Sequence, residues 1–228
     1  MAILQELPDI VTAIGGLGTA AFGLVDSTKV FWGGVNRIGF GKIKAVVLTL
    51  TPGTAVNGLN QARIISTLRA NWYNGEDLIS QKAIAKSLIK LALNPGNAAA
   101  VADAAGVDRA TLQSVAAKMV AGTALTSSES DVYARFDLIL TAILDQAYRD
   151  ADQRYTNGTR TWAAVFAMVL AFVGGWVVKQ TGLGEYFGSN DMWRALLAGV
   201  LAIPLAPVAK DLSSALAAAV NSMQLFNK

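Results

Sequence analysis

The residue types that most often carry enzymatic chemistry are scarce in this chain. It contains no His and no Cys, which excludes disulfide bonds, thiolate nucleophiles, zinc and haem sites built on those ligands, and any Ser-His-Asp relay. The segment Gly39-x-Gly41-Lys42 lacks the spacing of a phosphate-binding loop or a dinucleotide fingerprint. None of the long apolar segments contains a pair of acidic residues, which an ion path through a membrane would require. We therefore predict no catalytic residue, no metal site and no cofactor.

Charged residues do recur at helical spacing in one segment, residues 127–157. Three acids there precede a basic residue by four positions: Asp131 with Arg135, Asp145 with Arg149, and Asp150 with Arg154. Such pairs stabilise a helix by about 0.2 to 0.5 kcal/mol each. We interpret them as support for an exposed helix face and not as an active site.

The composition indicates a membrane protein. Of the 228 residues, 53% are hydrophobic and 15% are charged, and the mean hydropathy is +0.41. Soluble domains average about 45 to 50% apolar residues, glycine included, and about 25% charged residues. The chain therefore carries more apolar surface than one globular core would bury.

Two long apolar segments near the C-terminus predict a transmembrane hairpin. Residues 161–178 carry no charge, and as a helix they would rise about 27 Å, which nearly matches a hydrocarbon core of about 30 Å. Trp162 and Trp176 lie near the ends, at the level where indole prefers the headgroups. A second span is predicted at 192–209, with Arg194 in its first turn and a kink or break at Pro204. The alternative is a buried helical hairpin in a soluble core.

A third apolar segment, residues 10–25, is marginal in length for a full crossing. No Lys or Arg precedes it, so it does not resemble a secretory signal peptide. Gly15, Thr19 and Gly23 recur every four residues and predict a helix face without bulk, on which a second helix can pack closely. The partner is either the hairpin or a second protomer, and chance recurrence of glycine in an apolar helix remains the alternative.

The distribution of Lys and Arg predicts the orientation. Residues 27–44 contain four basic residues and no acid, whereas the only charged residues in 1–9 are Glu6 and Asp9. The first span is therefore expected to run from outside to inside, with the middle of the chain and the C-terminus in the cytoplasm. Arg37, Lys42 and Lys44 alternate with apolar residues and predict a helix over 34–50 that lies on lipid headgroups. A short strand at 44–51 is the alternative.

The remaining segments predict a helical domain. We expect helices at 54–73, at 76–93 with Ile84, Leu88 and Leu91 as the buried stripe, and at 127–157 with a joint at Asn157-Gly158. The segment 210–228 predicts a C-terminal amphipathic helix. Interaction faces are predicted at Phe136, Ile139 and Ile143, and at Leu216, Met223 and Phe226.

The order of these features resembles a group of uncharacterised bacterial integral membrane proteins. Those have an N-terminal span, a cytoplasmic helical stretch and a C-terminal membrane hairpin, entered through a helix with matching residues at Phe136, Asp137, Asp145, Tyr148, Arg149 and Arg154. The chain departs from the pattern because it lacks a dense basic cluster before the hairpin. The resemblance implies the topology and carries no activity.

Residues 101–115 resemble the turn region of a LacI-type helix-turn-helix, with Gly106 in the turn and Arg109 at the start of a recognition helix. That resemblance implies DNA binding. However, Asp103 and Asp108 balance Arg109 and Lys118 within residues 97–121, while contact with phosphates needs a positive surface. Two Ala-rich helices joined at Gly-Val also give this sequence, and we expect no nucleic-acid partner.

These observations predict an all-α integral membrane protein with about three transmembrane helices. The predicted parts are a membrane helix at 1–26, a cytoplasmic helical domain at 27–158 with a basic interfacial segment at 29–50, a hairpin at 159–209, and the tail at 210–228. We expect a non-enzymatic, self-associating scaffold or accessory subunit of the bacterial cytoplasmic membrane, with membrane lipids and an unidentified protein complex as partners. The alternative is a pore or channel subunit.

Overall fold

The computed structural model describes all residues except 1, 31–32, 54, 57–58 and 208–228, and it describes the backbone but not the side chains of 2–9 and 55–56. The chain is mostly helical, at 83%. It separates into two compact units, one formed by residues 1–35 and 156–228 and the other by residues 36–155. We call them the apolar unit and the helical unit. The predicted C-terminal helix, with Leu216, Met223 and Phe226, lies outside the described residues.

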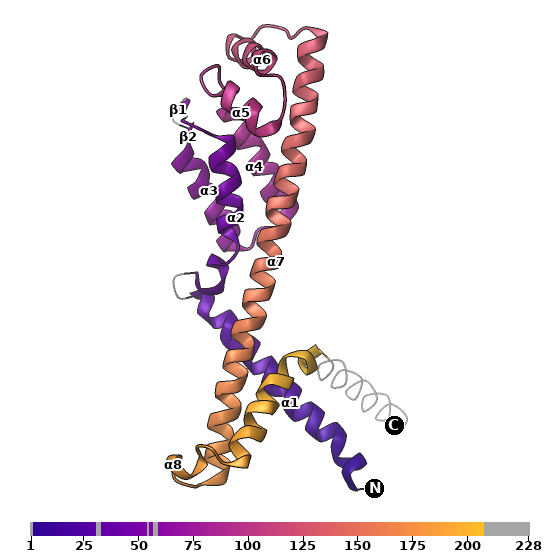
Figure 1. The fold of residues 1–228 in the computed structure, drawn as a ribbon, viewed down its shortest axis with the longest axis vertical. Helices are drawn as coiled ribbons and strands as arrows, with labels where there is room; N and C mark the ends of the chain where they lie inside the picture. Colours follow the sequence, from indigo (N-terminus) through magenta and orange to yellow (C-terminus); the bar gives the residue numbers. More distant parts are fainter. Residues whose placement is uncertain (1, 31–32, 54, 57–58, 208–228) are drawn as a thin grey trace, which may run out of the picture. The chain divides into compact units, whose positions relative to one another are not determined.

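The apolar unit brings three helical segments together. They are α1 (Ala2–Ser27), the C-terminal part of α7 (Ser127–Lys179), and a helix whose described part covers residues 190–207. Short 3-10 turns follow α1 at Thr28–Val30 and Gly34–Arg37, and α8 (Leu183–Tyr186) lies in the connection after α7. The three segments cross one another (Figure 1). The centre of this unit consists of Ala21, Ala167 and Ala202, one from each segment. Alanine at the meeting point lets the three backbones approach closely.

Glycines mark the closest approaches in the apolar unit. A Cβ atom on Gly18 would collide with the backbone carbonyl of Ala202, and one on Gly199 would lie 2.7 Å from the Cα atom of Met168. These contacts join α1 to helix 190–207 and that helix to α7. Because both obstacles are backbone atoms, no side-chain rotation could make room for a larger residue.

The predicted small-residue face of α1 is therefore only partly the packing face. Gly15 is buried, but Thr19 and Gly23 are exposed, and a Cβ atom on Gly23 would meet nothing within 4 Å. The side that packs within the protomer carries Gly18, Ala21 and Val25 instead. Several glycines lie close together in this segment, so sequence spacing alone does not select the correct face.

The helical unit begins with α2 (Phe40–Leu50), a two-stranded hairpin of β1 (Ala55–Val56) and β2 (Leu59–Asn60), and α3 (Gln61–Asn74). It continues with α4 (Leu78–Ala92), α5 (Ala98–Ala105), α6 (Arg109–Ala121) and the N-terminal part of α7. The strands pair antiparallel, Ala55 opposite Asn60 and Val56 opposite Leu59. The helices have clear boundaries: Asn60, Asp77 and Asp108 cap α3, α4 and α6 with their side chains.

The core of the helical unit forms along one stripe of α7. Phe136, Leu140, Leu144, Tyr148 and Ala151 follow one another at three- and four-residue steps and are all buried. α3 contributes Ile64, Leu68 and Trp72, and α2 contributes Ile43 and Val47. The predicted interaction residue Phe136 is fully buried in this core, while Ile139 and Ile143 are half-buried against it. These three residues stabilise the unit itself, and Phe136 is not available to a partner.

Two predicted helices begin later than expected. The segment 34–50 is divided at Gly39, whose φ of 95° interrupts the helix, so α2 starts at Phe40. Phe40, Ile43 and Val47 face the core of the helical unit. The alternative of a strand at 44–51 is wrong, because residues 44–50 belong to α2. The predicted helix 54–73 starts only at Gln61, because Asn60 accepts a hydrogen bond from the Arg63 amide and caps α3 there.

The buried face of α4 differs from the predicted one. Its buried residues are Gln81, Ala85, Ile89 and Ala92, whereas Leu91 is 67% exposed and Ile84 is 36% exposed. The small side chains of Ala85 and Ala92 allow close contact with the core. The carboxamide of Gln81 donates a hydrogen bond to the carbonyl of Glu76 (2.6 Å), which reduces the cost of burying it.

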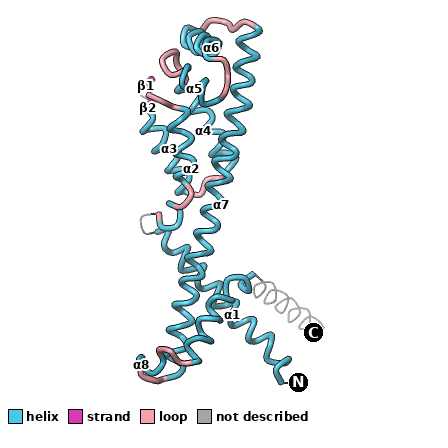
Figure 2. The backbone as a smooth tube through the Cα atoms, viewed as in Figure 1, coloured by secondary structure: helices cyan, strands magenta, loops and turns pink. Residues whose placement is uncertain are grey.

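α7 is a single helix of 53 residues, without the predicted joint at Asn157-Gly158 (Figure 2). An interior glycine costs a helix about 1 kcal/mol relative to alanine, which is too little by itself to end a helix of this length. The Thr161 hydroxyl donates to the carbonyl of Asn157, which keeps a polar side chain satisfied on the helix itself. Helix 190–207 likewise remains helical past Pro204.

The glycine contacts give a first prediction. Gly18→Leu should destabilise the purified protein by about 1 to 3 kcal/mol or more, because the new side chain meets the backbone of Ala202. Gly174→Leu is the control in the same apolar unit and should not lower the melting temperature, because Gly174 is exposed and a Cβ atom there meets nothing within 4 Å. Thermal unfolding in mild detergent measures both. Equal melting temperatures for the two variants would contradict the packing of α1 against helix 190–207.

Candidate functional site

The apolar unit exposes a continuous series of large apolar side chains. On α7 the exposed residues Val165, Val169, Val173 and Val177 are four apart and form one stripe. On helix 190–207 the exposed residues are Trp193, Leu197, Val200 and Leu201. Contiguous apolar surface of this extent is rare on a soluble monomer.

Among the described residues, two helices are long and apolar enough to cross a membrane. One covers residues Ile10–Thr28, with a mean hydropathy of 1.4, and the other lies within α7, with a mean hydropathy of 2.0. Only 22% and 11%, respectively, of their most apolar windows is buried. The core helix of a soluble protein is mostly buried, whereas these two windows are mostly exposed.

Charged residues of the hairpin gather where α7 ends. The ammonium group of Lys179 lies 2.5 Å from a carboxylate oxygen of Asp191, and the guanidinium of Arg194 lies 3.6 Å from the other oxygen. Arg194 is 81% exposed at its side chain, as expected for a residue that extends away from the apolar segment. The indole of Trp176 donates to the carbonyl of Thr181 (3.0 Å) and closes the turn after α7.

The hairpin connection is packed and not merely a loop. Tyr186 of α8 is 1% exposed and lies against Gly175, where a Cβ atom would collide with the tyrosine hydroxyl. Its ring makes an edge contact with Phe172 at a centroid distance of 5.3 Å. Gly175 therefore creates the space that Tyr186 fills, which fixes α8 against the end of α7.

In the helical unit, three lysines of α4 form ion pairs with two aspartates of α7. Lys82 contacts Asp145 at 2.6 Å, and Lys86 and Lys90 contact the two oxygens of Asp137 at 2.6 and 2.9 Å. Burial opposes ionisation of Asp137, but the two ammonium groups outweigh it and lower its pKa. The hydrogen bond from Lys82 lowers the pKa of Asp145.

These ion pairs border a shallow hollow of about 260 Å³. It is lined by the apolar residues Ile79, Ala83 and Leu144 and by the polar residues Lys82, Lys86, Thr141 and Asp145. Each of these charged groups already has an ion-pair partner, Lys82 with Asp145 and Lys86 with Asp137. The described residues also contain no group of three or more acids that could hold a metal ion.

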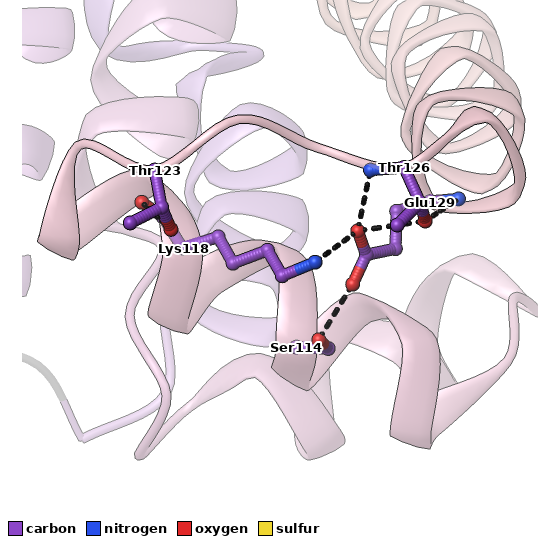
Figure 3. A network of polar contacts seen from close by, with 5 residues as sticks. All are labelled: Ser114, Lys118, Thr123, Thr126 and Glu129. Atoms are coloured by element: carbon purple, nitrogen blue, oxygen red, sulfur yellow. Dashed lines mark hydrogen bonds and ion pairs between the residues drawn. The ribbon is translucent and has the colours of Figure 1, made fainter.

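A second polar network joins α6 to the start of α7. The carboxylate of Glu129 accepts hydrogen bonds from the Ser114 hydroxyl (2.7 Å), the Lys118 ammonium (2.7 Å) and the Thr126 amide (2.7 Å) (Figure 3). Thr126 and Glu129 are three apart, the spacing of a capping box at a helix N-terminus. The hydrogen bond from Lys118, followed by those from Thr126 and Ser114, lowers the pKa of Glu129 to about 2. The network fixes the turn from α6 into α7.

The helix-turn-helix-like segment does form two helices, α5 and α6, joined through Gly106 in the left-handed conformation. Its basic residues are occupied within the protein. The guanidinium of Arg109 forms an ion pair with the carboxylate of Asp103, and Lys118 binds Glu129. Both basic side chains therefore have a carboxylate partner within the helical unit.

The predicted acid-before-base pairs on α7 do not form among the described residues. Asp145 instead binds Lys82 of α4, and the spacing argument also missed the ion pairs of Asp137 and Glu129 on α7. The four-residue spacing of Lys82, Lys86 and Lys90 was the available signal, because it places three ammonium groups on one side of α4. Of the predicted headgroup residues, Arg37 and Lys44 are exposed and Lys42 is partly exposed.

Comparisons of the chain with protein-family models, with curated proteins and with solved structures find no match.

The Glu129 network gives a second prediction. A carboxyl group whose pKa is about 2 in the folded protein and about 4.5 when unfolded contributes stability that is complete above pH 4.5 and is lost as the pH falls towards 2. Glu129→Gln should lower the stability at pH 7 and should also weaken the acid dependence between pH 5 and 2. Urea unfolding at several pH values, followed through the helical signal, measures both effects.

The matched control for this experiment is Glu76→Gln, which changes an exposed acid in the turn before α4. The control should preserve the acid dependence of the parent protein. If Glu129→Gln and Glu76→Gln showed the same pH profile, the Glu129 carboxylate would not be the group that couples α6 to α7.

Proposed function

We propose that the chain is an integral protein of the bacterial cytoplasmic membrane, in which the apolar unit crosses the bilayer and the helical unit lies in the cytoplasm. The observation that carries the proposal is the exposure of α7 between residues 161 and 178. This segment has no charged residue and only a small buried fraction, so water is an unfavourable surrounding for it and a bilayer is a favourable one.

We propose helix 190–207 as a third spanning helix. It packs on both α1 and α7 through Gly18 and Gly199, so insertion of α7 would bring it into the same apolar phase. Its first turn carries Asp191 and Arg194, and pairing with Lys179 at the end of α7 would place these charges together at one membrane surface.

The proposed orientation follows from the charged residues on either side of the first span. Arg37, Lys42 and Lys44 lie after the first span, whereas Glu6 and Asp9 lie before it. Retention of basic segments in the cytoplasm places residues 36–155 inside and the turn around Gly184 outside.

We propose a scaffold or accessory role for this membrane protein, with self-association through α1. Two observations support this role. The polar clusters of the helical unit are satisfied by contacts among its own helices, as in the Lys82–Asp145 and Lys118–Glu129 pairs. The exposed side of α1 carries Thr19 and Gly23, and the Thr19 hydroxyl donates to the carbonyl of Gly15, so this small-residue face is free of unsatisfied polar groups and suits a second apolar helix.

The rival function is a pore subunit, and liposome flux separates the two. Purified protein in liposomes should cause no ion leakage above that of empty liposomes if it is a scaffold. Reproducible, protein-dependent leakage would contradict the scaffold function and support the pore subunit.

The topology gives a third prediction. The chain has no cysteine, so single cysteines can be introduced by Ser128→Cys in the helical unit and Gly184→Cys in the hairpin turn. Both positions are exposed, and a Cβ atom on Gly184 meets nothing within 4 Å. In intact spheroplasts, an impermeant maleimide should label the cysteine at 184 and should label the one at 128 only after the cells are opened.

Two outcomes would contradict this topology. Labelling at 128 in intact spheroplasts would reverse the orientation. Release of the protein from membranes by alkaline carbonate would show that the apolar unit is not inserted.

A further inference from the structure

The contact between α4 and α7 joins unequal numbers of positive and negative side chains. Lys82, Lys86 and Lys90 recur every four residues on α4, whereas Asp137 and Asp145 are eight residues apart on α7. Lys82 binds Asp145, while Lys86 and Lys90 both bind Asp137. Among the residues that the structure describes, these lysines have no other carboxylate partner. The contact therefore carries one positive charge more than its carboxylates neutralise.

Thr141 occupies the place on α7 where a third carboxylate would balance these charges. It lies four residues from Asp137 and four from Asp145, so the three side chains share one side of the helix. The Thr141 hydroxyl donates to the backbone carbonyl of Asp137 (2.8 Å). A hydroxyl oxygen can also accept hydrogen bonds, but it carries no charge. Lys86, which lies beside Thr141, has to share the carboxylate of Asp137.

Of the two lysines on Asp137, Lys90 has the more complete set of contacts. Besides its ion pair at 2.9 Å, its ammonium group lies 5.0 Å from the ring centroid of Tyr133. An aromatic ring at this distance attracts a cation. The side chain of Lys86 is 29% exposed, so its ammonium group remains within reach of a ligand from solution.

The hollow of about 260 Å³ lies at this imbalance of charge, since Lys82, Lys86 and Thr141 line it. Asp145 also lines it, but its carboxylate already binds Lys82. The other lining residues are apolar: Ile79, Ala83 and Leu144. Ile79 is 78% exposed, so the hollow offers apolar surface as well as charge. Pockets for drug-sized ligands measure about 300 to 1,000 Å³, so this hollow suits a smaller molecule.

We propose that the hollow binds small monocarboxylates with a short hydrocarbon chain. The ligand carboxylate lies beside Thr141 and accepts hydrogen bonds from the ammonium groups of Lys82 and Lys86. Hydrogen bonds between ionised groups are about twice as strong as those between neutral groups. The hydrocarbon chain contacts the apolar side chains of Ile79 and Leu144. One negative charge matches the surplus at the contact, and the apolar lining favours such a ligand over an inorganic anion.

This site is independent of the proposed membrane insertion, because every lining residue belongs to the helical unit. A bound carboxylate gives Lys86 a counter-charge of its own. It should therefore strengthen the contact between α4 and α7 and raise the melting temperature of the protein.

The test measures binding of hexanoate to the full chain in lipid nanodiscs. Fluorine NMR follows hexanoate with a terminal trifluoromethyl group, and empty nanodiscs correct for uptake by the lipid. Binding should broaden the fluorine signal in a saturable way that unlabelled hexanoate reverses. Hexanol, which lacks the charge, should compete roughly tenfold more weakly. Acetate, which lacks most of the chain, should also compete roughly tenfold more weakly, because it buries fewer methylene groups.

Thr141→Glu supplies the missing carboxylate from the protein itself. The variant should melt at a higher temperature than the parent protein, and it should bind labelled hexanoate at least about tenfold more weakly, because Lys86 then has its own partner. Ala142→Glu is the matched control. It adds the same charge at the next, exposed position of α7 and should leave hexanoate binding nearly unchanged.

Lys86→Gln tests the site without adding a charge. It should weaken hexanoate binding, while Lys90 still neutralises Asp137 and preserves the fold. If Thr141→Glu failed to fold, Lys86→Gln would decide the question alone. Uptake equal to that of empty nanodiscs, or equal binding by the parent protein and Lys86→Gln, would overturn the proposal.

The same experiment separates failure of this inference from failure of the proposed function. A chain that inserts into nanodiscs but does not bind hexanoate would remain a membrane protein without this ligand site. A chain that stays soluble and does not enter nanodiscs would overturn the membrane proposal alone, and its hexanoate binding would be measured in buffer.

Discussion

The need to keep the apolar part of α7 away from water constrains the rest of the structure. Residues 161–178 present valines on one side, while Ala163 and Ala167 are fully buried and Phe166 is partly buried. Burial of apolar surface is worth about 25 cal/mol for each Å², yet the protein leaves Val169 and Val177 more than half exposed. The bilayer that we propose as the surrounding would remove this cost without further protein contacts. It would also account for the alanines at the centre of the apolar unit, since lipid solvates larger apolar side chains.

Different contacts stabilise the helical unit. Its core is a conventional apolar stripe along α7, while polar side chains determine where its helices begin and how they are aligned. Asp137 and Asp145 set α4 alongside α7 through three lysines, and Glu129 sets the turn between α6 and α7. Since each of these carboxylates is bound to an ammonium group, the charges of this unit are mainly structural.

The sequence predicted the helical class and the positions of the apolar helices because uncharged runs such as 161–178 have few alternative explanations. It also located the turns at Gly75 and Gly106, where glycine adopts the left-handed conformation at the end of a helix. The prediction from sequence failed where more than one helix face was equally plausible. Four glycines between Gly15 and Gly23 allow several packing faces, and only the approach of Ala202 selects Gly18. The lysine–aspartate contacts were missed because they join residues more than 45 positions apart, which local spacing does not reveal.

The central claim is that residues 161–178 of α7 lie in lipid, and the most direct measurement is the accessibility of a spin label at Val169. The label is attached through Val169→Cys in the full chain, which has no other cysteine, and the protein is reconstituted in bilayers. Collisions with oxygen, which concentrates in the hydrocarbon core, are compared with collisions with a water-soluble nickel complex. We predict frequent collisions with oxygen and few with nickel, with the opposite preference for a label at Ala134. Nickel collisions at position 169 as frequent as those at position 134 would show that this face of α7 is in water and would contradict the account.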